Sequence, residues 1–133
     1  MSVANLTNPQ EFYGDGMDSI VIRHYVAGIK GGRTLDTTGF APSAVEAGHL
    51  VIFDTENEVY KPMPIAADGK SFGTLPANHK YVGVVVNSVP AARAMVGIMY
   101  DGEVNDLAMP YKMDSAMKAA VVSAVPTLTF MHD

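Results

Sequence analysis

Short strands separated by turn-forming residues fill residues 47–105, and this pattern constrains the fold more than any other feature of the chain. The apolar stretches lie at residues 47–53, 59–62, 81–89 and 94–100, with Gly, Pro, Asn or Asp between them. β-Branched and aromatic side chains bounded by such residues are typical of strands in a pleated, half-buried sheet. The sequence therefore predicts a mainly β fold, a small antiparallel β-barrel or sandwich.

The acidic stretch at residues 54–58 follows the first of these strands. Its D-x-E-x-E spacing is found at the start of calcium loops, but the glycine and the distant glutamate that complete such a loop are missing. Because Val59 and Tyr60 resume a strand at once, a solvated hairpin connection centred near Glu56 and Asn57 is the better interpretation.

Two glycines allow predictions about the later strands. Gly83 lies within the most apolar strand and indicates either a bulge or the close approach of another backbone. Asp101-Gly102 favours a type I′ turn, because both central residues of that turn need a positive φ angle. We therefore expect a hairpin between residues 95–100 and 103–107.

One helix has a convincing period. Apolar residues recur at helical spacing without a miss at Met113, Ala116, Met117, Ala120, Val121 and Ala124. Asp114 or Ser115 can cap its start, and Pro126 ends it. We expect one C-terminal α-helix, about residues 113–124, and a last strand at residues 127–131.

The first residues of the chain have neither a helical nor a strand period. We expect residues 1–16 to form an extended N-terminal arm before a single β-rich domain at residues 17–133. Leu6, Phe12 and Tyr13 stand out as apolar side chains of this arm, and such side chains usually dock on a neighbour or on the domain itself. A disordered tail with incidental aromatic residues is the alternative.

Residues 17–29 alternate loosely and predict the first strand of the domain. Both of its faces carry large residues, among them Arg23 and Tyr25, so one face is a candidate interface. These two residues and the three apolar residues of the arm form the candidate interface set. The Gly31-Gly32 pair that follows lacks the spacing of a phosphate-binding P-loop and is interpreted as a turn.

The charge of the chain bears on its partners. The net charge is −5 with only 9 Lys and Arg, which argues against a surface that collects nucleic-acid phosphates. No apolar run approaches the ~20 residues that span a bilayer, and the N-terminus has no export pattern, so we expect no membrane partner. The absence of cysteine excludes disulfides and thiolate metal sites.

The composition also favours assembly. Charged residues make up 17% of the chain, and the chain contains 9 Met, whereas charged residues are roughly 25% of typical globular domains. Oligomer interfaces are depleted in Lys, Glu and Asp and enriched in Met. A homo-oligomer is the favoured interpretation, and a monomer that uses Met as an adaptable core residue is the alternative.

No set of residues demands catalysis. The four histidines lie on separate elements without zinc-site spacing: His24, His49, His79 and His132. Ser88 has no obvious base beside it. The acids gather in predicted turns, where carboxylates normally face water: Asp54, Glu56, Glu58, Asp101, Glu103 and Asp106. Two of them in one cleft could hydrolyse glycosides, but we expect a protein that is not an enzyme, with no metal and no cofactor.

Five short pieces follow one another in the middle half of the chain: Ala47-Gly48 at a strand start, the acidic turn from Asp54, the strand end Tyr60-Lys61-Pro62, the strand with Gly83, and the return Gly102-Glu103-Val104. Their order resembles that in tailed-bacteriophage head decoration and head-fibre base proteins. Residues 30–43 and 65–80 have no counterpart in the resemblance, so no capsid-contacting residue is carried over.

The resemblance implies a small β-rich domain with a helix, assembled as a homotrimer on the outer surface of the virion. Its partners would be the major capsid protein and itself, and the N-terminal arm would order against the shell. The protein would be made in the cytoplasm of the host bacterium.

A carbohydrate- or host-surface-binding module, of the head-fibre or receptor-binding type, is the main alternative function. It would place exposed aromatic residues such as Tyr60, Tyr81 or Tyr100 on one shallow face. A hydrolase that uses two turn acids is a further alternative, and it requires those acids to converge in a pocket.

Overall fold

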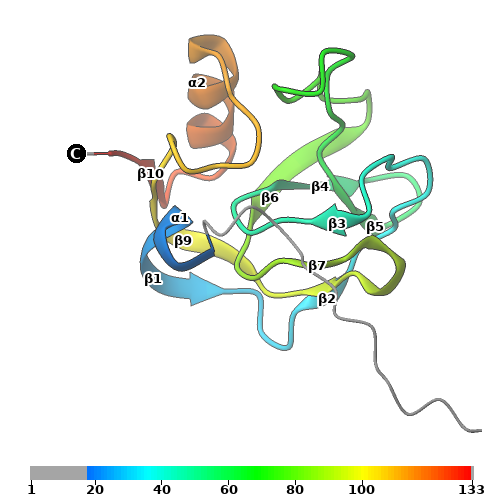
Figure 1. Cartoon of the computed structure of the whole chain (residues 1–133), viewed down its shortest axis with the longest axis horizontal. Coiled ribbons are helices and arrows are strands. Elements are labelled where there is room, and N and C mark those ends of the chain that lie inside the picture. Colours follow the sequence, from blue (N-terminus) through cyan, green and yellow to red (C-terminus); the bar gives the residue numbers. More distant parts are fainter. Residues whose placement is uncertain (1–17, 133) are drawn as a thin grey trace, which may run out of the picture.

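The computed structural model describes residues 18–132, which are drawn in colour in Figure 1. The predicted N-terminal arm, with Leu6, Phe12 and Tyr13, lies outside the described residues. The chain is mainly β, with 40% strand and 15% helix, antiparallel sheets and one C-terminal helix, so the predicted fold class is confirmed. The strands of the described part do not close into a barrel.

The elements follow one another along the chain and are labelled in Figure 1 where there is room. The strands are β1 (Ile22–Gly28), β2 (Arg33–Thr34), β3 (Ala44–Val45), β4 (Leu50–Asp54), β5 (Val59–Pro62), β6 (His79–Val85), β7 (Val89–Pro90), β8 (Met95–Val96), β9 (Ile98–Val104) and β10 (Leu128–Phe130). The helices are α1 (Asp18–Val21), the 3-10 turn η1 (Ala91–Arg93) and α2 (Ser115–Ala124).

The main sheet has six strands, five of them in the antiparallel order β1-β9-β6-β4-β5. β9 has three partners, because β1 lies along one side of it while β6 pairs with its first residues and β10, in parallel, with its last. Two short ribbons, β2-β8 and β3-β7, are separate from this sheet. β1 and β5 are therefore the two ends of the strand order.

The central strands are apolar on both faces because a separate core covers each face. In β4, Leu50 and Ile52 belong to a core that includes α2 and Phe72, whereas Val51 belongs to a second core that includes Val85. All three β4 side chains are fully buried. A continuous apolar run, rather than strict alternation, is typical of a strand covered on both faces.

The helix α2 forms where its period and its cap predict it. The backbone N–H of Met117 donates to the Asp114 carboxylate at 2.7 Å, which satisfies one of the unpaired N–H groups at the helix start. Val121 is fully buried in the core on that side of the sheet. The predicted helix is confirmed, with Ser115 as its first residue, and the predicted last strand is confirmed as β10.

The hairpin predicted at Asp101-Gly102 is wrong, because both residues lie inside β9. Pairing with β1 on one side and with β6 and β10 on the other keeps the strand extended. Gly102 has a φ of 152°, and a Cβ on it would clash with the carbonyl oxygen of His24 in β1. This glycine therefore permits a close strand approach and not a chain reversal.

Two other predicted strands differ at their ends. The strand predicted at residues 17–29 begins at Ile22 in the described part, because residues 18–21 form α1 and bury Val21 against Gly48. The strand predicted at residues 81–89 ends at Val85, and β7 then pairs with β3 instead. Pairing between distant segments, rather than local pattern, sets both boundaries.

The acidic hairpin connection and the role of Gly83 are confirmed. Residues 55–58 join β4 to β5 as antiparallel neighbours. The register between β4 and β6 shifts opposite Gly83, and a Cβ on that residue would clash with the carbonyl oxygen of Met99. A bulge and a close backbone approach therefore occur at the same glycine.

Candidate functional site

The most exposed strand of the main sheet is β1. β9 pairs with one side of it, and no other strand of the described part pairs with its outer side. Residues 23–26 are all exposed, and the two apolar side chains among them, Tyr25 and Val26, are 52% and 53% exposed. An edge strand that exposes apolar side chains is a template for another strand. We call the outer side of β1, with residues 23–26, the β1 edge.

A second apolar area adjoins the start of this edge. Ile20 in α1 and Leu107 after β9 are 48% and 72% exposed. Both border a hollow of about 380 Å³, which Arg23 also borders. The structure therefore places both described members of the candidate interface set, Arg23 and Tyr25, on β1, with Arg23 beside the hollow.

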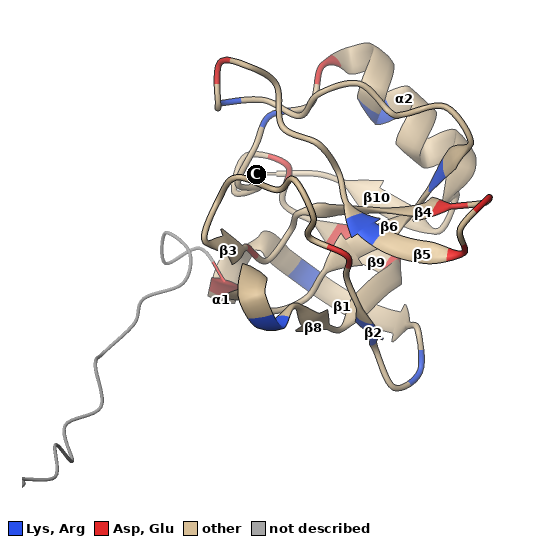
Figure 2. Cartoon of the chain, turned by 90° about the vertical axis from the view of Figure 1, so that its right-hand side faces the viewer, with Lys and Arg blue, Asp and Glu red and all other residues tan. Residues whose placement is uncertain are grey.

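The opposite end of the sheet, β5, is covered by its own chain. Leu35 bridges to Tyr60, and the N–H of Asp36 donates to the Tyr60 carbonyl oxygen at 2.8 Å. The guanidinium of Arg33 lies 5.7 Å from the centre of the Tyr60 ring. Figure 2 shows the acidic β4–β5 connection in red at one end of this strand. The segment from Arg33 to Asp36 lies along the outer side of β5 and leaves little room there for another strand. We call this segment the β5 guard.

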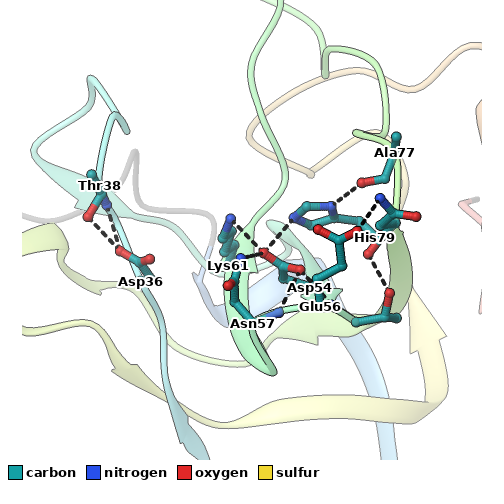
Figure 3. A network of polar contacts seen from close by, with 10 residues as sticks. Asp36, Thr38, Asp54, Glu56, Asn57, Lys61, Ala77 and His79 are labelled. Carbon is teal, nitrogen blue, oxygen red and sulfur yellow. Dashed lines mark hydrogen bonds and ion pairs between the residues drawn. The ribbon is translucent and has the colours of Figure 1, made fainter.

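Asp54 anchors the acidic connection, as Figure 3 shows. Its carboxylate accepts hydrogen bonds from the side-chain amide of Asn57 at 2.9 Å and from the backbone N–H groups of Asn57 and Glu56, and it pairs with Lys61 at 3.3 Å. These donors, Asn57 above all, hold the pKa of Asp54 well below its usual range. Its side chain is only 5% exposed, so the expectation that the turn acids face water is wrong for Asp54.

His79 approaches Asp54 from β6 without a hydrogen bond (Figure 3). Its Nδ1 lies 2.8 Å from the Ala77 carbonyl oxygen, which only accepts, so this nitrogen carries the proton. Its Nε2 is buried without a hydrogen-bond partner in the described part and lies 3.7 Å from the Asp54 carboxylate.

His49 is fully buried within a cage of three aromatic rings. The rings of Phe40, Phe72 and Tyr111 pack edge-on against it, with centres 5.0–5.4 Å away. Its Nε2 donates to the carbonyl oxygen of Met63 at 2.9 Å, while its Nδ1 has no hydrogen-bond partner among residues 18–132. Burial lowers the pKa of His49 to about 4, so the ring is neutral near pH 7.

Two adjoining hollows lie beside this cage. The larger, about 440 Å³, is lined by Phe40, Tyr111 and Pro64 among others, and the smaller, about 250 Å³, shares Phe40 and Pro64 and extends to His79. Asp36 is the one carboxylate among their lining residues. Glycoside hydrolysis needs two carboxyl groups in one cleft, and these hollows do not supply the pair.

Asp106 is a second structural anchor. Its carboxylate accepts from Lys118 of α2 at 2.6 Å and from His132 at 2.7 Å. Burial alone would raise its pKa, but the two hydrogen bonds outweigh it and the pKa lies below the usual value.

Among residues 18–132, no group of three or more His, Asp or Glu side chains is placed to hold a metal ion. The described helices are all too short or too polar to cross a membrane.

Two of the three tyrosines proposed for a carbohydrate face come together. Tyr60 and Tyr81 border a shallow hollow of about 360 Å³ with Phe53 and Lys80. Tyr81 is only 9% exposed and belongs to the core, so the expectation that it would be an exposed aromatic residue is wrong. Tyr100 does not line the hollow and is 40% exposed on β9.

Sequence reasoning missed several residues of these sites. Val26 could have been added to the interface set because it follows Tyr25 in the same short strand. Leu107 has no local signal, since it joins the exposed area only through the pairing of β9 with β1. The cage around His49 is assembled from three distant segments and has no local signal either.

Comparison of the chain with protein families, with curated proteins and with solved structures finds no match.

Proposed function

We propose that the chain is a non-enzymatic structural protein of a tailed-bacteriophage virion, which decorates or cements the outer capsid surface as a homotrimer. The β1 edge carries this proposal, because no other strand of the described part pairs with it and its apolar side chains, Tyr25 and Val26, are half exposed on a chain that is poor in charge. In a free monomer such an edge favours uncontrolled pairing, whereas in an assembly it becomes an interface.

The choice of partner rests on the resemblance of residues 47–105 to head decoration proteins. The major capsid protein is the partner, and the protein passes from the host bacterial cytoplasm to the capsid exterior. A protein that binds only the assembled lattice stabilises it by mass action, as RT ln(1 + [L]/Kd) at each site. A trimer that engages several capsid subunits at once adds avidity.

Light scattering of the purified chain, followed by co-sedimentation with capsids, tests this function. We expect a trimer that sediments with capsids and saturates. Deletion of residues 1–15 should leave the domain folded and weaken capsid binding, because the arm is expected to order against the shell. A monomer that ignores capsids would overturn the proposal, and unchanged capsid occupancy after the deletion would remove the arm from it.

The hollow beside Tyr60 and Tyr81 favours a second candidate, a carbohydrate- or host-surface-binding module. Aromatic rings and a cation around a shallow hollow suit the apolar face and the hydroxyl groups of a sugar. Binding of the isolated chain to a glycan array, lost in Tyr60→Ala and kept in Tyr100→Ala, would support it. No binding to any glycan would reject it.

A further inference from the structure

We propose that the hollow of about 360 Å³ beside Tyr60 binds an acidic sugar, with the sugar carboxylate at Lys80 and the sugar ring against the aromatic side chains. This inference rests on the second proposed function, carbohydrate binding, and names the class of sugar. The hollow, which we call the Tyr60 hollow, lies between the first half of β6, which pairs with β4 but not with β9, and the end of α2.

Three side chains form a row across three neighbouring strands beside the Tyr60 hollow. Phe53 of β4 is paired with Tyr60 of β5 and, on its other side, with Lys80 of β6. The centres of the Phe53 and Tyr60 rings are 4.9 Å apart, and the Lys80 Nζ lies 5.4 Å from the centre of the Phe53 ring. Because residues paired across strands share a face of the sheet, the two rings and the ammonium group form one surface.

This surface is positively charged. The guanidinium of Arg33 lies 5.7 Å from the centre of the Tyr60 ring, so a cation stands at each end of the row. The ion pairs of the described part include neither Arg33 nor Lys80, although the chain has 14 Asp and Glu and only 9 Lys and Arg. None of the described residues that line the Tyr60 hollow carries a carboxylate. The charge is therefore available to an anionic ligand.

Two acids of the connection between β4 and β5 are engaged elsewhere. Asp54 follows Phe53 in β4, and successive side chains of a strand point to opposite faces. Its carboxylate pairs with Lys61 at 3.3 Å. Glu56 accepts from the side-chain amide of Asn78 at 2.9 Å. Neither acid therefore neutralises the row.

The end of α2 supplies groups of the opposite kind. Ala124, the last residue of the helix, and Val125 line the Tyr60 hollow. The last carbonyl oxygens of a helix have no partner within it and carry a partial negative charge. Such oxygens accept hydrogen bonds from hydroxyl groups and repel a second carboxylate. A ligand with one carboxylate, several hydroxyl groups and an apolar ring face matches the whole hollow, and a uronic acid unit of a polysaccharide is such a ligand.

Titration of the purified chain with two glycosides tests this assignment. Methyl glucuronoside and methyl glucoside differ only in a carboxylate against a hydroxymethyl group. We expect the glucuronoside to bind about fivefold more tightly at low salt, because an exposed ion pair with Lys80 is added, and calorimetry measures both affinities. The preference should fall as salt is added. Lys80→Gln should remove it, whereas Lys70→Gln, the control, should keep it, because Lys70 is exposed and does not line the hollow.

Equal binding of the two glycosides, or a preference that survives Lys80→Gln, would overturn the inference and leave carbohydrate binding standing. Binding of neither glycoside would overturn it as well, and carbohydrate binding itself would be rejected only if no glycan on the array were bound. N-acetylglycine, which has a carboxylate and no sugar ring, is the third probe. If it bound as tightly as the glucuronoside, the hollow would be a site for carboxylates in general, such as those of an acidic peptide, and the inference would be wrong.

Discussion

β1 and β5, the two end strands of the main sheet, are covered to different extents. Leu35 bridges to β5, and the N–H of Asp36 donates a hydrogen bond to it. The acidic connection that precedes β5 is held in place by hydrogen bonds to Asp54. β1 has register shifts along its pairing with β9, but in the described part its outer side has no strand and its apolar side chains are half exposed. Bulges alone blunt an edge only partly. The difference teaches that the described part of the chain covers the β5 side of its sheet itself and places no strand along the outer side of β1.

Gly102→Ala should have the largest effect, because it would separate β1 from the sheet. The new Cβ would clash with the backbone of His24, and the φ of 152° is unsuitable for alanine. Strain and overpacking together should lower the free energy of unfolding by about 4 kcal/mol, measured by urea unfolding. Gly97→Ala is the control, because its Cβ would meet Val86 only at 3.6 Å, and an equal loss in both variants would contradict this account.

Leu35→Ala should weaken the β5 guard. Leu35 is only 4% exposed and bridges to Tyr60. Truncation of a buried leucine costs about 3 kcal/mol, and hydrogen exchange should rise in β5 while β1 is unchanged. Exchange that rises equally at both ends of the sheet would show that the two edges are not independent.

Low pH should also destabilise the molecule, through the buried side chain of His49. The unfolded chain protonates a histidine near pH 6.5, whereas burial keeps the pKa of His49 at about 4, so the unfolded state binds more protons between these values. The stabilisation from His49 is complete above pH 6.5 and is lost as the pH falls towards 4, by about 2.5 kcal/mol between pH 7 and pH 4.5. Urea unfolding at both pH values measures it, and His49→Gln should remove most of the loss.

Val26→Lys should have the smallest effect on folding. Val26 is 53% exposed, and surface substitutions away from special features usually change the free energy of unfolding by less than about 0.5 kcal/mol. The oligomeric state should change while thermal unfolding of the domain at low concentration stays the same. A large loss of stability in the monomer would mean that the β1 edge is needed for folding and not for assembly.

The sequence was sufficient for elements whose cause is local. The period of α2 and the cap at Asp114 needed no distant residue, and the two-sided apolar run of β4 was already visible in its letters. Asp101-Gly102 was misleading because three partner strands override the local turn preference.

Sites built by distant segments were not predictable. The two-residue ribbons β2-β8 and β3-β7 are too short to leave a pattern. The cage around His49 requires Phe40, Phe72 and Tyr111 to meet in space, and the edge position of β1 follows only from the strand order. Tyr25 was therefore included in the interface set because of its large side chain. The sequence did not show that its strand lies at the edge of the main sheet.

The three partners of β9 also set the order in which the molecule can form. β1 and β10 come from opposite ends of the described chain, so β9 pairs with β1 only after a long stretch of chain has closed. Domains dominated by such non-local pairings fold slowly, in milliseconds to seconds. A chain interrupted before Leu128 would leave the second half of β9 uncovered on one side and would lose the buried side chain of Leu128, which shares a core with Val121 of α2.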